Sequence, residues 1–285
     1  MESITGLKNN EKKSLFNLGV REKTILSILA FGFFFIAILI WGSFIKADNL
    51  YVDLPNKFQT PSLSHLFGTD WVGRDMLTRT IKGLSLSMKI GLLATLTSTI
   101  IAIILGIIGP TFGRRVDAVV TWFIDLVLSV PHTLVVILIS IAMGGGLKGI
   151  VVGVAATHWT SLTRVIRAEV MQIMESDYTK ISKNFGKSNW YIAKEHILPH
   201  VIPQIIVNAV LIFPHAILHE ASVTFLGFGL PPHEPAIGVI LSESMKYLTS
   251  GYWWLAFFPG LKPISPFSDF HSKPYLCATE KFIRS

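Results

Sequence analysis

Residues 87–109, SMKIGLLATLTSTIIAIILGIIG, place this chain in a fold class. At ~1.5 Å per residue, a helix of this length crosses a hydrocarbon core of ~30 Å. A soluble protein of this size does not need an uninterrupted apolar run of about 20 residues. The run therefore predicts a membrane-spanning helix.

Comparable apolar stretches lie on both sides of this run. We expect further spans at 25–45, 117–142, 149–166 and 201–226, and a sixth that begins near Tyr252. The fold class is therefore predicted to be all-α, a polytopic membrane helix bundle. The sixth span is short, because its apolar residues 252–261 would cover only ~15 Å and the prolines that follow forbid a continuous helix.

The expected organisation has three parts. Residues 1–24 form an N-terminal segment, residues 25–261 a transmembrane domain with five full spans and a truncated sixth, and residues 262–285 an atypical tail. A shift of reading frame near Lys262 would explain why the last span stops and a proline-rich tail follows.

The composition agrees with a membrane protein. Hydrophobic residues make up 51% of the 285 residues and charged residues only 15%, against about 25% charged in soluble domains. The net charge of +7 is carried partly by basic residues in the N-terminal segment and the loops, where they set membrane orientation. This pattern predicts a multi-pass protein of the cell membrane with a cytoplasmic N-terminus, and no nucleic-acid partner. The single Cys277 excludes an intramolecular disulfide and a cysteine metal cluster.

The longest polar interval on the predicted cytoplasmic side is 167–200, RAEVMQIMESDYTKISKNFGKSNWYIAKEHILPH. Helices are expected at 170–186 and 188–197, with Gly186 allowing a turn between them. Pro199 should end the second helix and open the next span. Such a helix-turn-helix along the membrane surface forms a rigid knob that can transmit the movement of a partner to the flanking spans.

Three segments resemble the inner-membrane permeases of dipeptide, oligopeptide and nickel ABC importers, of the second-permease type. Residues 65–75 are similar to the H-x-x-G-T-D-x-x-G-R-D signature, and 186–199 to the loop on which the ATPase docks. Residues 220–229, EASVTFLGFG, are similar to E-A-S-x-S-F-L-G-x-G. The signature residues are Gly68, Thr69, Asp70, Gly73, Arg74 and Asp75. Their Asp and Arg charges could pin the junction between loop and span.

The resemblance assigns an ATPase-coupling role to seven residues: Asp177, Lys180, Ile181, Ser182, Gly186, Leu198 and Pro199. One departure lies among them. The family loop begins Glu-Ala-Ala, whereas this chain has Lys180-Ile181-Ser182. Asp177 or Glu175, one helical turn earlier, would then supply the acidic contact.

The resemblance also implies the partners. They are a sister permease, two cytoplasmic ABC ATPases, an extracytoplasmic solute-binding protein and the lipid bilayer. This chain performs no chemistry and binds no cofactor, since ATP and Mg²⁺ belong to the ATPases. Peptides, nickel and a metal held by a small organic chelator all remain open as substrates.

Five polar residues within the predicted spans are candidates for the translocation pathway: Asp125, His158, His215, His219 and Glu220. Such residues are costly in lipid and by default face the bundle interior or a water path. His215 and His219 share a helical face and could ligate a transition metal. Lining a pathway without coordination, and plain hydrogen bonding between helices, are the alternatives, and no metal ligand is assigned.

Two other function classes fit less well. An ion- or proton-coupled secondary transporter could use Asp125, His215 and Glu220 as a proton relay. It would have no need of a docking loop, and the chain lacks an inverted repeat. A membrane-embedded enzyme is not favoured, because neither an H-E-x-x-H pattern nor a Ser/His/Asp arrangement occurs.

Overall fold

The computed structural model describes residues 20–45 and 52–260. Over these residues the chain is helical, and its only β feature is one isolated bridge between Thr69 and Asp75. The all-α prediction is confirmed. The main helices are α1 (Val20–Phe44), α2 (Met76–Phe112), α3 (Arg114–Leu128), α4 (His132–Ala142), α5 (Gly146–Glu175), α6 (Asp177–Asn184), α7 (Asn189–Ile192), α8 (Leu198–Phe225) and α9 (Ile237–Leu248).

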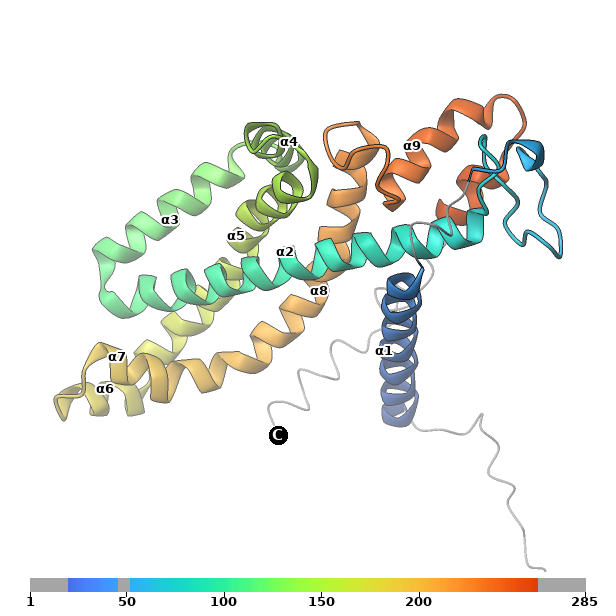
Figure 1. Ribbon diagram of the computed structural model, residues 1–285. Helices are drawn as coiled ribbons and strands as arrows, with labels where there is room; N and C mark the ends of the chain where they lie inside the picture. The colour runs from blue at the N-terminus through green and yellow to red at the C-terminus, as the bar shows by residue number, and fades with distance from the viewer. Residues whose placement is uncertain (1–19, 46–51, 261–285) are drawn as a thin grey trace, which may run out of the picture.

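Helix α2 is the central element of the bundle (Figure 1). It contains the run 87–109 but extends beyond it at both ends. Four points along α2, at Met76, Leu84, Ile90 and Ala102, contribute to four different buried apolar clusters. The other helices therefore assemble around α2.

The third predicted span, 117–142, is not one helix. Helices α3 and α4 are bent by 92° at a break between Leu128 and His132. Pro131 explains the break, since it has no N–H to continue α3 and disfavours helical geometry at the residue before it. The predicted span 117–142 therefore consists of two helices that meet at a sharp bend.

Helix α4 packs closely on α5 because α5 presents glycine at the contact. A Cβ on Gly153 would lie 2.9 Å from the carbonyl oxygen of Val136, and one on Gly149 would lie 2.7 Å from that of Ser140. Small residues allow such close approach between helices in membranes. This packing places the start of α4 beside the middle of α5.

The polar interval 167–200 folds differently from the prediction in two respects. Helix α5 runs on to Glu175, and Ser176, in an extended conformation, separates it from α6, so no helix covers 170–186. The second helix does not end at Pro199. Helix α7 passes into a π-helical turn, Ala193–Ile197, and then directly into α8, with Pro199 in the first turn of α8.

Two features lie near the start of α2. Helix α9 is short and packs on α2 and α8, and the sequence reasoning did not predict it. Residues 254–260 form a helix where the sixth span was expected to begin. The tail 262–285 and the segment 1–19 lie outside the described residues.

The number of spans stays a prediction. Among the described residues, two continuous helices meet the length and hydropathy of a span, Met76–Phe112 and Asn189–Phe225. The bent pair α3 and α4 would make a third, and Gly32–Phe44 is a shorter apolar helix. Helix α5 is long enough to span, but it carries several polar and basic side chains.

Candidate functional site

The segment 176–198, termed here the coupling segment, projects from the ends of α5 and α8 (Figure 1, lower left). Its turn depends on Gly186, whose φ is +76°. The N–H of Gly186 donates to the carbonyl of Lys183 and the N–H of Lys187 to that of Ser182, which closes the end of α6. Ser188 then caps α7, accepting a hydrogen bond from the N–H of Tyr191 at 3.2 Å.

A buried base fixes the coupling segment to the bundle. Ile192, Ala193 and Ile197 pack into the same apolar cluster as Ile166 and Val170 of α5. The ring of His196 lies 3.0 Å from the hydroxyl of Ser182 and contacts the rings of Tyr178 and Tyr191. These contacts join α6 to the π-helical turn that leads into α8.

The coupling segment exposes three large apolar side chains among its charged residues. Phe185 is 80% exposed, Trp190 68% and Ile181 53%. Large apolar side chains exposed on one short segment, over a packed base, are candidates for contact with another protein.

The remaining predicted coupling residues lie on or beside this surface. Asp177 is exposed in the first turn of α6. Lys180 forms an exposed ion pair with Glu175 at 3.2 Å. Leu198 is partly buried and Pro199 is exposed, both in the first turn of α8. The structure therefore brings Glu175 beside the basic residue that departs from the family pattern.

The signature residues form a different kind of structure at the opposite end of α2 (Figure 1, right). The buried Asp70 carboxylate accepts from the N–H groups of Val72 and Arg74, both at 2.9 Å, and from Nε of Arg74 at 2.7 Å. Asp75 caps α2, accepting from the N–H of Thr78 at 2.8 Å. These contacts hold the loop against the first turn of α2.

The same loop is linked to α9 by a buried arginine. Arg79 donates to Asp70 at 3.2 Å and to Glu243 of α9. The Thr69 hydroxyl, which is fully buried, bonds to the backbone of Asn56 and Gln59. Arg79 and Glu243 were not among the predicted site residues. Their pairing spans 164 positions, so no local pattern in the sequence could indicate it.

The five candidate pathway residues do not gather in one place. Asp125 lies exposed and pairs with Arg164 of α5 at 2.8 Å. Glu220 is fully buried, and one of its carboxylate oxygens accepts from the hydroxyl of Thr224 at 3.0 Å. His215 is exposed on α8. Only His158 and His219 come together.

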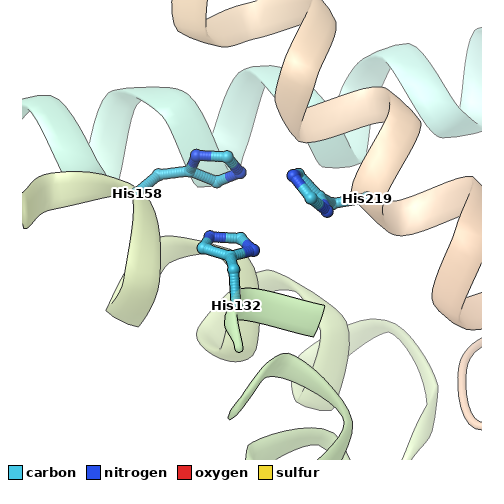
Figure 2. A group of neighbouring side chains, drawn as sticks. All are labelled: His132, His158 and His219. Atoms are coloured by element: carbon cyan, nitrogen blue, oxygen red, sulfur yellow. The ribbon is translucent and has the colours of Figure 1, made fainter. Parts of the chain in front are cut away.

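A third histidine joins them. His132 of α4, His158 of α5 and His219 of α8 point toward one another (Figure 2). One ring nitrogen from each lies within 4.8 Å of the other two. The sequence reasoning missed His132, although it is an ionisable residue in an apolar run, the same signal that identified the others. We refer to these three residues as the histidine cluster.

The comparisons with known proteins agree on a family. Residues 98–261 match the family described as binding-protein-dependent transport system inner membrane component. The chain is 37% identical over 199 residues to the dipeptide transport system permease protein DppC of Bacillus subtilis, covering 70% of this chain and 62% of that protein. It is 33% identical to the oligopeptide permease OppC of the same organism, covering 76% of this chain and 70% of the relative.

Solved structures support the fold alone. A chain of the MetNI methionine ABC transporter in an inward-facing conformation aligns with a TM-score of 0.56 at 14% identity, over 73% of this chain and 96% of that one. A chain of an amino acid ABC transporter aligns with a TM-score of 0.53 at 15% identity, over 73% and 94%.

Proposed function

Because the chain belongs to the family of binding-protein-dependent transport system inner membrane components, we propose that it is one of two permease subunits of an ATP-driven importer. It is an integral protein of the inner membrane. The single observation that carries the subunit assignment is the coupling segment, which exposes Ile181, Phe185 and Trp190 above a buried base.

The coupling segment supports a mechanical link to a cytoplasmic ATPase. Phe185 and Trp190 would enter a cleft of the ATPase, with Ile181 beside them. When ATP closes two such ATPases, α6 is pushed, and His196 together with the buried base transmits the displacement to α5 and α8. The spans then switch between inward- and outward-open states by rigid-body motion.

The remaining subunits follow from this arrangement. Two ATPases hold the ATP and Mg²⁺, a sister permease supplies the other half of the pathway, and a solute-binding protein delivers the substrate outside. The N-terminus is cytoplasmic, on the side of the basic loops. Curated relatives named for dipeptide and oligopeptide transport make peptides the first substrate class to test, with nickel or a chelated metal second.

The coupling segment also separates this function from a secondary transporter. Of the three residues considered for a proton relay, Asp125 is exposed and ion-paired, His215 is exposed and Glu220 is fully buried. These positions do not form a relay, so the ATP-driven reading is the one we favour.

The test is co-purification from detergent extract. The tagged chain is expressed with the sister permease and the ATPases, and the ATPase recovered with it is quantified. We expect stoichiometric recovery from the wild type, and a loss of about tenfold or more when Phe185 and Trp190 are both changed to Ala, since buried aromatic anchors dominate interfaces. The matched control is Leu63→Ala, which removes a 99% exposed side chain at the opposite end of the molecule.

Uptake into proteoliposomes tests the energy source. A di- or tripeptide should accumulate only when ATP is enclosed with the ATPases, and a proton ionophore should leave the rate unchanged. Uptake that needs a proton gradient and ignores ATP would contradict the proposal, as would undiminished ATPase recovery with the double variant.

A further inference from the structure

The histidine cluster joins three helices that the sequence keeps apart. His132 is the first residue of α4, His158 lies in the middle of α5, and His219 is near the end of α8 (Figure 2). The ring centroids are 4.3 Å apart for His132 and His219, 4.7 Å for His132 and His158, and 5.2 Å for His158 and His219. All three side chains are partly buried.

Three ring nitrogens in this cluster lack a hydrogen-bond partner among the described residues. Both nitrogens of His132 and Nε2 of His158 are buried, and neither ring finds a donor or acceptor for them within the described part of the chain. Buried polar atoms are normally satisfied, and leaving several unsatisfied at one point is costly. Contacts between the rings themselves do not satisfy these nitrogens, so the cluster has unused acceptor capacity directed at a common point.

The spacing is close to that of a metal site. Tetrahedral ligation with metal–nitrogen distances of about 2.0–2.1 Å sets ligand nitrogens roughly 3.3 Å apart. The present nitrogens all lie within 4.8 Å of one another, so they need to approach by no more than about 1.5 Å to reach this separation.

We propose that His132, His158 and His219 bind one divalent transition-metal ion. Neutral imidazoles favour borderline ions such as Zn²⁺, Ni²⁺, Co²⁺ and Cu²⁺, whereas Mg²⁺ and Ca²⁺ require oxygen ligands. Three protein ligands leave a fourth position for water or a donor atom of a small ligand. The ion ties α4 and α5 to α8.

This site differs from the one that the sequence pattern indicated. The i,i+4 spacing of His215 and His219 predicts a pair on α8, but His215 is exposed and does not belong to the group of converging nitrogens. The ligands come instead from three helices, and the break at Pro131 is what presents His132 to the other two.

Binding is measured on the full-length chain, purified in detergent with its co-purifying subunits through a tag without histidine. Co²⁺ is titrated while visible d–d absorption is recorded, and Zn²⁺ is then added in competition. We expect one Co²⁺ per chain with the intense absorption of tetrahedral coordination, displaced by one Zn²⁺. Loss of one ligand in His132→Gln, His158→Gln or His219→Gln should weaken Zn²⁺ binding by at least the roughly 10- to 100-fold that outer-shell changes cost.

Two variants serve as matched controls. His233→Gln removes an exposed histidine outside the cluster, and His215→Gln removes the histidine one turn before His219; both should bind like the wild type. Size-exclusion profiles establish that each variant is folded. The melting temperature should rise with Zn²⁺ in the wild type and in both controls, and should not rise in the three cluster variants.

Three results would overturn the proposal. One is the absence of a Co²⁺ spectrum at equimolar metal in the folded wild type. Another is equal Zn²⁺ affinity in the wild type and in a folded triple variant of the cluster. The third is weakening by His215→Gln with none by His132→Gln, which would assign the metal to the pair on α8. None of these measurements depends on transport, so they stand apart from the test of the importer function.

Discussion

Two glycine turns at opposite ends of the bundle look alike in the sequence and differ in the structure. Gly73 belongs to the signature loop and Gly186 to the coupling segment, and both have positive φ, +83° and +76°. A Cβ on Gly73 would lie 1.8 Å from the carbonyl oxygen of Asp53, whereas a Cβ on Gly186 would meet nothing within 4 Å. The signature loop is a closed structural junction, and the coupling segment is an open surface with space for a partner.

The largest effect on stability should come from Arg79→Met in the closed junction. The change keeps most of the bulk of the side chain. It removes the ion pair of Arg79 with Glu243 and the hydrogen bond of Arg79 to Asp70. Breaking a buried pair in this way costs roughly 3–5 kcal/mol. Melting followed by size exclusion measures it, with the exposed Arg115→Met as control. Equal melting temperatures for the two variants would show that the junction does not hold α2 to α9.

Gly73→Ala should cost somewhat less, about 2–4 kcal/mol, from a left-handed backbone conformation together with overpacking against Asp53. The same melting assay applies. The control is Gly113→Ala, where φ is +109° and a Cβ has open space, so that only backbone strain contributes. If Gly113→Ala is the more damaging of the two, the close approach at Gly73 is not what matters.

Gly186→Val should lower stability by only about 1–2 kcal/mol, the strain of a left-handed residue without a clash. Its effect on ATPase co-purification should be larger, a loss of about tenfold or more, because the turn sets how α6 and α7 present their apolar face. Gly186→Asn is the matched control, since Asn adopts this conformation more readily. Normal uptake and normal ATPase recovery by Gly186→Val would rule out the coupling segment as the link.

Trp190→Ala should have the smallest effect on the fold, within about 0.5 kcal/mol, because the side chain is 68% exposed. Removing an interface anchor nevertheless costs about 2 kcal/mol of binding, so ATPase affinity should fall roughly 30-fold. Trp190→Ala should therefore reduce ATPase binding and leave stability almost unchanged, whereas Arg79→Met should lower stability most. A Trp190→Ala chain that unfolds would place this residue in the core instead.

Apolar runs predicted helices well where one helix accounts for the whole run. Residues 87–109 lie inside α2, and 201–226 correspond closely to α8, despite Pro203 and Pro214. A single continuous helix does not form where one residue interrupts the helical backbone. Pro131 breaks 117–142, and Ser176, whose hydroxyl bonds to the carbonyl of Ile173, ends α5 inside the expected helix 170–186. Side chains that hydrogen-bond to their own backbone compete with helix in this way.

The sites were predicted unevenly for a related reason. The signature loop and Gly186 were recognisable because their residues are close in sequence. The histidine cluster and the Arg79–Glu243 pair depend on helices distant in sequence meeting in space. Helix α9 was missed because it is short and amphipathic, with Glu243 and Lys246 interrupting its apolar residues. Contacts of this kind follow from tertiary packing, which local patterns do not contain.

The π-helical turn at Ala193–Ile197 changes the angle about the helix axis at which the side chains of α7 point relative to those of α8. A π turn holds one residue more than an α turn, and each residue of an α-helix accounts for about 100° of rotation. Compared with a continuous α-helix of the same number of residues, the π turn therefore changes the direction of Trp190 relative to His219 by about that angle. Deleting one residue from 193–197 should convert the π turn into an α turn and leave Trp190 pointing where it does now, whereas a deletion within the α-helical part of α8 before His219 would turn it away.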